Sequence, residues 1–214
     1  NPAVIVGSGS IRGLMAATHQ GLSSISMIAN IPNMVYLAPS NAEEYIAMLD
    51  WALDQDKHPV YIAIPSGPVV HAEGPVRTNF DALNTYEVTR KGSKVAVLAL
   101  GDFYDLGEKT VEALSSILGI EATLVKPYFA SGIDQHLLDN LVKDHDVIVT
   151  IEDGIIEGGW GQNIASYLGT SPARVLNYGV KKAFYDRVNV AELMRESHLE
   201  PELIAADVKQ VLGL

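Results

Sequence analysis

Short apolar runs alternate along the chain with stretches of helical spacing. In the first third, apolar runs at 4–6, 34–37 and 60–64 are bounded by glycine, proline or polar residues, which predicts short buried strands. Polar residues at 40–41 precede acidic residues and a stretch with helical spacing. This pattern predicts a capped helix that ends near Asp56.

The pattern becomes more regular in the rest of the chain. The predicted strands are 94–100, 121–125, 146–151 and 174–178, and the predicted helices are 104–118, 134–143, 158–168, 190–197 and 200–212. Gly119 should end the first of these helices, and Asp134 should cap the second. Strands that alternate with helices predict a largely parallel sheet covered on both faces.

The segment 67–91 differs from its neighbours because it holds prolines and glycines and has weak periodicity. We interpret it as a linker with a short strand around 86–89. The sequence therefore predicts an α/β fold with two units, residues 1–66 and residues 92–214, joined by this linker.

The composition is that of a folded globular protein, with 48% hydrophobic and 19% charged residues. A formal net charge of -11 disfavours nucleic acid, because an acidic surface repels phosphates. No apolar run approaches the roughly 20 residues that cross a bilayer, so we expect no membrane role. The chain has no cysteine and no signal-peptide pattern, and we expect a cytoplasmic protein. Residue 1 is not Met, and we expect translation to start upstream.

The tetrapeptide Thr18-His19-Gln20-Gly21 is the most informative candidate for chemistry. A histidine beside a glycine in a loop can reach a ligand, and an imidazole can exchange a proton near neutral pH. The alternative is a loop histidine that is solvated or caps a backbone group. On the residues alone, that structural role is the commoner outcome.

Other polar positions favour structural roles. Free amides at the start of the helix at Gly158-Gly159-Trp160-Gly161 could hold an anion, but close packing of helix on strand is the preferred interpretation. Glu152 and Asp153 follow a strand, where α/β sheets often place sites, yet a structural role is favoured. Asp102 and Asp105 are interpreted as a helix cap and a solvated turn rather than a metal loop.

The remaining histidines lack the spacing of metal ligands. They are His58, His71, His136, His145 and His198. We expect all of them to be surface or capping residues.

Two series of motifs resemble the transketolase and 1-deoxy-D-xylulose-5-phosphate synthase family. The first is Thr18-His19-Gln20-Gly21, Ile31-Pro32-Asn33-Met34, Ala38-Pro39-Ser40-Asn41 with Glu44, and Pro59-Val60-Tyr61-Ile62 with Pro65. It is similar to the second half of the family's pyrimidine-binding domain. The second is Lys126-Pro127, Thr150-Ile151-Glu152-Asp153-Gly154 and Gly158-Gly159-Trp160-Gly161, similar to the family's C-terminal domain. The resemblance covers nearly the whole chain.

The resemblance implies a partial pyrimidine-type domain at 1–66 and a three-layer transketolase C-terminal domain with a mostly parallel sheet at 92–214. It also implies a transferase that moves a two-carbon or acyl unit between small carbonyl compounds, of the kind used in isoprenoid biosynthesis. His19 inherits the role of the family's histidine, which lines the substrate channel and helps to hold or protonate the sugar-derived intermediate. No other site residue transfers securely, and the cofactor-binding residues stay unassigned.

The implied cofactor is thiamine diphosphate with a divalent metal such as Mg²⁺, bound in the complete enzyme. The family's diphosphate-binding domain and its activating glutamate have no counterpart in these residues. We therefore expect the chain to be inactive alone and to need an N-terminal domain or a partner chain. The resemblance further implies a homodimer with sites formed between subunits.

Two departures from the family pattern bear on activity. Ser66 stands where these synthases place a phosphate-binding arginine, and Leu14-Met15-Ala16-Ala17 lacks the aspartate that commonly precedes the histidine. Two alternatives therefore stay open: a non-catalytic oligomerisation or regulatory protein that retains this fold, and a β-type subunit of a 2-oxo-acid dehydrogenase.

Overall fold

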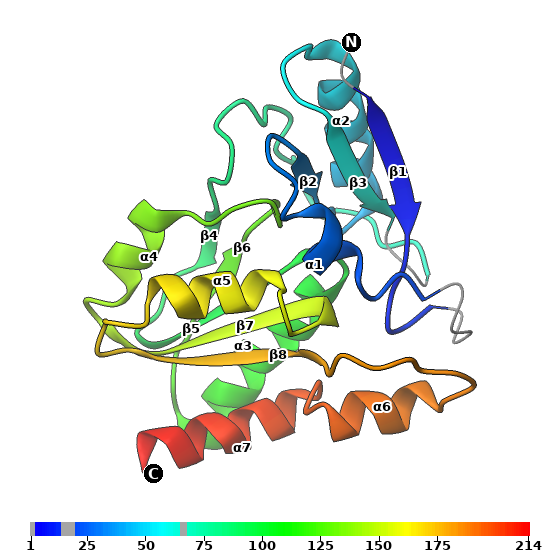
Figure 1. Cartoon of the computed structure of the whole chain (residues 1–214). Helices are drawn as coiled ribbons and strands as arrows, with labels where there is room; N and C mark the ends of the chain where they lie inside the picture. Colours follow the sequence, from blue (N-terminus) through cyan, green and yellow to red (C-terminus); the bar gives the residue numbers. More distant parts are fainter. Residues whose placement is uncertain (1–2, 14–19, 65–67) are drawn as a thin grey trace.

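The computed structural model describes residues 3–13, 20–64 and 68–214, and among them the strands form two sheets (Figure 1). The first sheet has the order β1-β3-β2, and its strands are β1 (Val4–Ser8), β2 (Val35–Leu37) and β3 (Val60–Ile64). All of its pairings are parallel. The predicted apolar runs of the first third are thus confirmed as strands.

Helix α1 (Ser24–Ile28) lies between β1 and β2 in the chain, and α2 (Ala42–Asp54) lies between β2 and β3. Asn41 caps α2 by accepting a hydrogen bond from the backbone amide of Glu44. The Glu44 carboxylate accepts in return from the backbone amide of Ser40 at 2.8 Å. Such a reciprocal cap satisfies amides that a helix start leaves free, which confirms the predicted start.

The second sheet has the order β4-β6-β5-β7-β8. Its strands are β4 (Glu87–Arg90), β5 (Lys94–Ala99), β6 (Thr123–Lys126), β7 (His145–Ile155) and β8 (Arg174–Val180). Only the edge pairing of β4 with β6 is antiparallel among the described strands. The mostly parallel sheet is confirmed, and the segment predicted as a linker ends in its edge strand.

Helices cover both faces of the second sheet, as Figure 1 shows. They are α3 (Tyr104–Leu118), α4 (Gln135–Leu141), α5 (Trp160–Tyr167), α6 (Val190–Glu196) and α7 (Pro201–Leu212), and a 3-10 turn, η1 (Gly101–Phe103), precedes α3. One buried cluster includes α3 and α7 residues, and another includes α4 and α5 residues. Gly119 ends α3 at φ 67°, and Asp134 caps α4 through the Leu137 amide, as predicted.

The central strand β5 shows why its sequence is a continuous apolar run. Val95, Val97 and Ala99 belong to the cluster with α3 and α7. Ala96 and Leu98 belong to the cluster on the opposite face. Successive side chains of a strand point to opposite faces, so a sheet covered on both sides requires every position to be apolar.

A short backbone pairing joins the first sheet to the second unit. Leu37 at the end of β2 forms an antiparallel bridge with Phe129. The Ala38 amide donates to the Tyr128 carbonyl at 2.8 Å, and the Ala130 amide donates to the Tyr36 carbonyl at 2.9 Å. The two units therefore share hydrogen bonds between main chains as well as side-chain contacts.

One of the five histidines expected to be surface or capping residues is buried. His145 is 5% exposed, its Nε2 lies 2.7 Å from Thr123 Oγ1, and its Nδ1 lies 2.8 Å from the Leu141 carbonyl. It caps the last turn of α4 from inside the protein, so the expected capping role is confirmed for this residue. Its other partner, Thr123, comes from a different strand.

No helix in the described part of the chain combines the length and the apolar character needed to span a bilayer.

Replacing Leu114 with Ala should lower the free energy of unfolding by about 2–5 kcal/mol, because it opens a cavity in the core beneath α3. Ile117→Ala, at a position of the same helix that is 53% exposed, is the matched control and should change it by less than about 0.5 kcal/mol. Urea unfolding followed by circular dichroism measures both. Equal losses would contradict the assigned buried face of α3.

Candidate functional site

The loop after β1 lies where the carboxyl ends of parallel strands from both sheets come together, a common position for sites in α/β proteins. Its base is a backbone contact between Gly9 and Gly21. A Cβ atom on Gly9 would lie 2.6 Å from the Gly21 Cα atom, and Gly21 has φ +59°. Both positions require glycine, because any side chain would force the two chain segments apart.

Residues beside this base belong to the core of the second unit. Ile11 is 0% exposed and Leu22 is 5% exposed, and both lie in the cluster built around α3, α7 and β7. The Ile155 amide, at the end of β7, donates to the Leu22 carbonyl at 3.0 Å. The loop is thus anchored on both sides by apolar burial.

Arg12 ties the loop to the start of α3. Its guanidinium contacts the Asp105 carboxylate through two nitrogens, at 2.9 and 3.3 Å, and donates to the Asp102 carbonyl at 3.2 Å. It also lies 4.7 Å above the centroid of the Phe103 ring. A planar guanidinium suits such a bidentate contact. Asp105 is therefore an ion-pair partner as well as a residue of a helix start, a role that the sequence did not predict.

Asp153 lies under the same loop. Its Oδ1 accepts the Ile11 backbone amide at 2.7 Å, and its Oδ2 has no hydrogen-bond partner among the described residues. Burial raises the pKa of Asp153 from 3.8 to about 7, against the lowering effects of the Ser10 side chain and of the Ile11 amide. A carboxyl group in this state can hold a proton at neutral pH.

The side chain of Glu152, a residue of β7, reaches the amino end of α5. Its carboxylate accepts the backbone amides of Trp160 at 2.8 Å and Gly161 at 3.0 Å. A Cβ atom on Gly159 would lie 2.6 Å from the Glu152 carboxylate, which explains the glycine turn. Burial raises the pKa of Glu152 to about 7, although these amides lower it. The structural interpretation of the turn is confirmed, and the anion that its amides hold is the protein's own side chain.

A cleft of about 1280 Å³ runs beside Arg12, between the start of α2 and β4. On its wall, Lys126 Nζ lies 2.6 Å from the Glu44 carboxylate and 4.0 Å from the centroid of the Tyr104 ring. Glu44 is 2% exposed, so this ion pair is shielded from solvent. Because the two residues lie 82 positions apart, the pair could not be predicted from sequence spacing.

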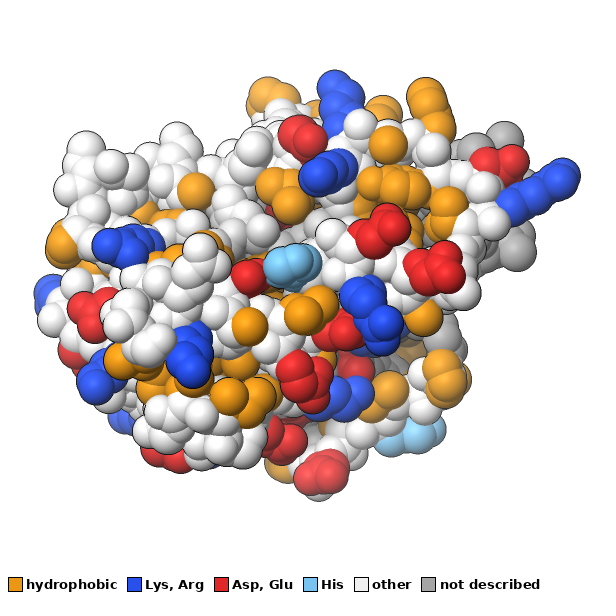
Figure 2. All heavy atoms as spheres, turned by 90° about the horizontal axis from the view of Figure 1, so that it is seen from below, with side chains coloured by type: hydrophobic (Ala, Val, Ile, Leu, Met, Phe, Trp, Pro, Cys, Tyr) orange, Lys and Arg blue, Asp and Glu red, His pale blue; other side chains and the backbone are white. Residues whose placement is uncertain are grey.

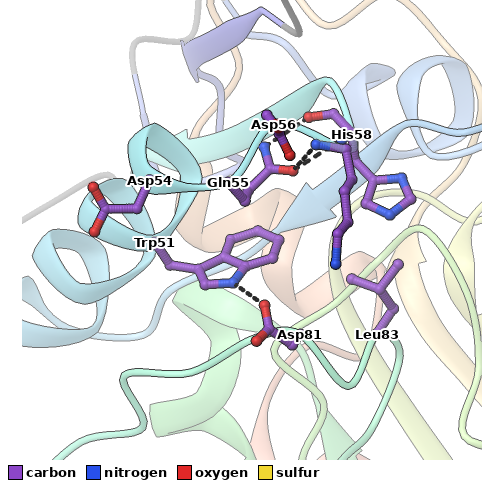
Figure 3. Close-up of a pocket in the computed structure, with 8 residues that line it drawn as sticks. Trp51, Asp54, Gln55, Asp56, His58, Asp81 and Leu83 are labelled. Atoms are coloured by element: carbon purple, nitrogen blue, oxygen red, sulfur yellow. Dashed lines mark hydrogen bonds between the residues drawn. The ribbon is translucent and has the colours of Figure 1, made fainter.

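A smaller pocket of about 370 Å³ lies at the end of α2 (Figure 3). Trp51 Nε1 donates to Asp81 Oδ1 at 2.9 Å, and Gln55 Oε1 accepts the backbone amides of Lys57 and His58. These polar groups hold the turn that leads into β3. The pocket therefore lies at the amino end of a parallel strand, away from the edge where the loop after β1 lies.

His19 lies outside the described residues. Its neighbour in the chain, Gln20, is 5% exposed and donates from its side chain to the Tyr185 carbonyl. Among the described residues, no group of three or more His, Cys, Asp or Glu side chains could hold a metal ion. The polar residues that the structure brings together at this site include Ser10, Arg12, Asp102, Asp105 and Asp153.

Family models match two successive parts of the chain. The model for the pyrimidine binding domain of transketolase matches residues 2–69, and the model for the transketolase C-terminal domain matches residues 84–204. The 1-deoxy-D-xylulose-5-phosphate synthase of Pseudoalteromonas translucida is 35% identical over 207 residues, covering 95% of this chain and 32% of that protein. The enzyme of the same name from Clostridium tetani is 30% identical, and the match covers 91% of this chain and 31% of that protein. The chain spans about a third of the length of these relatives.

Solved structures share the fold. A split gene transketolase, described as an inactive beta4 tetramer, superposes with a TM-score of 0.81 at 24% identity, covering 99% of this chain and 67% of that chain. A transketolase mutant from Pichia stipitis gives a TM-score of 0.74 at 17% identity, and the match covers 98% of this chain and 30% of that chain.

The buried carboxyl of Asp153 should make stability depend on pH. Burial raises its pKa from the ordinary 3.8 to about 7, so the folded protein binds the proton more tightly than the unfolded chain does. This contribution is complete below pH 4 and is lost as the pH rises through 7. Asp153→Asn should therefore gain stability relative to the wild type between pH 5 and pH 8. Urea unfolding at both pH values measures this, and exposed Asp54→Asn should show no such gain.

The difference in unfolding free energy between Asp153→Asn and the wild type should change from pH 5 to pH 8. An equal difference at the two pH values would contradict the idea that this carboxyl holds a proton.

Proposed function

Because the chain belongs to the transketolase family, we propose that it is the carboxyl-terminal part of a thiamine-diphosphate-dependent transferase. The reaction moves a two-carbon or acyl unit between small carbonyl compounds, as in the 1-deoxy-D-xylulose-5-phosphate synthases that the chain resembles. The observation that carries this proposal is the match of both family models, in order, to one short chain.

The proposed catalytic residue is His19. It belongs to the Thr18-His19-Gln20-Gly21 motif, whose last two residues lie at the anchored base of the loop after β1. An imidazole there can donate a hydrogen bond or a proton to a substrate oxygen. The carboxyl ends of parallel strands meet beside the described residues Gln20 and Gly21, which supports this assignment.

The cofactor would be thiamine diphosphate with a divalent metal such as Mg²⁺, which supplies the carbanion chemistry of this enzyme class. The described residues do not fit its metal-bound diphosphate, because no cluster of candidate ligands is present among them. We assign the diphosphate contacts to an N-terminal domain or partner chain, and relatives about three times longer support that assignment.

The substrates are proposed to be small carbonyl compounds. Ser66 replaces the arginine that grips a substrate phosphate in related synthases, and it lies outside the described residues. Arg12 is a poor substitute because its guanidinium is already paired with Asp105. The acceptor therefore need not carry a phosphate.

The assembly is proposed to be a cytoplasmic homodimer. We also propose the division into residues 1–66, a linker at 67–91 and residues 92–214, and the separate family matches at 2–69 and 84–204 support it in outline. Acidic and basic side chains are interspersed on the face in Figure 2. The relatives favour the transferase over the β-type dehydrogenase subunit and the non-catalytic protein.

Replacing His19 with Ala in the complete enzyme should lower kcat by about 100- to 10,000-fold, because it removes a group that exchanges protons with the substrate. Steady-state turnover with a ketose or 2-oxo-acid donor measures this. His136→Ala, an exposed histidine of α4, is the control and should keep full activity. Unchanged turnover in the His19 variant would refute the assigned role.

The 214-residue chain alone should show no turnover with thiamine diphosphate and Mg²⁺, because the diphosphate contacts are proposed to lie elsewhere. Adding the N-terminal part of the same protein should restore activity. The assay compares the chain, the N-terminal part and their mixture at equal concentrations. Turnover by the chain alone would overturn this part of the proposal.

A further inference from the structure

The segment between β8 and α6 presents an aromatic ring among unpaired cations. Phe184 is 95% exposed, so almost all of its side chain is in contact with water. Three exposed cations lie close to it in the chain, and none of them takes part in an ion pair within the described residues; they are Lys181, Lys182 and Arg187. We call these four residues the basic tip. One exposed apolar side chain is ordinary, but an aromatic ring beside free cations is typical of a contact surface.

The main chain of the basic tip is already ordered. The Lys182 amide donates to the Glu157 carboxylate at 2.9 Å, and the Tyr185 hydroxyl donates to the Lys181 carbonyl at 2.8 Å. Tyr185 also packs against the buried cluster that includes α3 and α7 residues. Because the backbone is held in place, docking of the tip costs mainly the rotational freedom of its side chains.

A surface with matching chemistry lies at the carboxyl end of α2. The pocket of about 370 Å³ shown in Figure 3 has the side chains of Trp51 and Leu83 among its lining, which gives it an apolar part. Its aspartates outnumber the one lysine that lines it: the charged residues are Asp54, Asp56, Asp81 and Lys57. An aromatic ring and a cation thus both find suitable partners there.

The negative charge at this end of α2 is not balanced within the chain. The carboxyl end of a helix carries a partial negative charge, and α2 has no basic residue in its last turn. Asp54 and Asp56 are exposed, and neither belongs to an ion pair in the part of the chain that the structure describes. Cations supplied from outside the chain would therefore stabilise this helix end.

The two surfaces lie on different parts of the molecule. Figure 1 shows α2 near the top and the segment between β8 and α6 at the lower right. The pocket lies at the amino end of β3 in the first sheet, and the basic tip follows the carboxyl end of β8 in the second. A contact between them therefore requires two copies of the chain.

We propose that the basic tip of one copy binds the α2 pocket of a second copy. The Phe184 ring enters between Trp51 and Leu83, and the cations of the tip face Asp54 and Asp56. This contact joins two different surfaces of the chain head to tail. It is separate from the proposed transferase site and does not depend on that activity. A second copy is favoured over other anionic partners because the chain itself carries a pocket that combines apolar walls with aspartates.

A contact this small should be weak, with a dissociation constant on the order of 10–100 µM. Sedimentation velocity of the full chain over a concentration series that brackets this range measures it. Phe184→Ala should weaken the association about tenfold or more, because it removes the ring at the centre of the contact. Ile117→Ala, at an exposed apolar position of α3, is the control and should associate like the wild type. Added salt should weaken the association, because it screens the tip cations from the aspartates.

A mixing experiment tests the head-to-tail pairing. Phe184→Ala keeps the α2 pocket, and the double variant Asp54→Asn/Asp56→Asn keeps the basic tip. Each should be mainly monomeric alone, whereas their equimolar mixture retains one intact contact and should form a one-to-one complex. Asp146→Asn, an exposed aspartate of β7, is the charge control and should self-associate like the wild type. All of these substitutions are at exposed positions, so thermal unfolding should be unchanged.

The proposal is overturned if the wild type stays monomeric through the series, if Phe184→Ala associates like the wild type, or if the mixture of the two variants stays monomeric. A wild-type chain that binds vesicles of anionic phosphatidylglycerol but not a second copy would assign the basic tip to a lipid surface, and would overturn the proposal as well.

Discussion

The structure depends on a core that both units share. Ile11 and Leu22, which flank the loop after β1, are buried among side chains of the second sheet and its helices. Removing them would leave holes beneath α3 and β7, and removing the second unit would expose them to water. Burying such a side chain contributes about 1.5–3 kcal/mol, so neither unit reaches its full stability without the other.

Much of the fold could be predicted because its strands are buried on both faces. A short stretch of sequence is enough to predict an apolar strand such as β5, and the ends of helices are marked by single residues, Asp134 for α4 and Gly119 for α3. Contacts between residues far apart in the chain cannot be predicted in this way. The pairs Arg12–Asp105 and Glu44–Lys126 depend on how the two sheets pack together, which no short window of sequence contains.

The candidate site was predictable in part, for the same reason. The motif around His19 is local, and the role proposed for this residue rests on the family resemblance alone. The role of Asp153 depends on a partner 142 positions away, so its sequence neighbourhood gave only the general expectation of a structural acid. The glycine turn before α5 indicated either close packing or an anion, and the structure has both, because Glu152 supplies the negative charge.

The antiparallel bridge between Leu37 and Phe129 restricts how this part of the protein can move. Swinging one sheet away from the other would break the backbone hydrogen bonds at Ala38 and Ala130, each of which costs about 1–3 kcal/mol when its groups stay buried and unpaired. A hinge at this point is therefore unfavourable. The relative position of the two sheets is thus held at this contact by main-chain hydrogen bonds, which substitutions of nearby side chains do not remove.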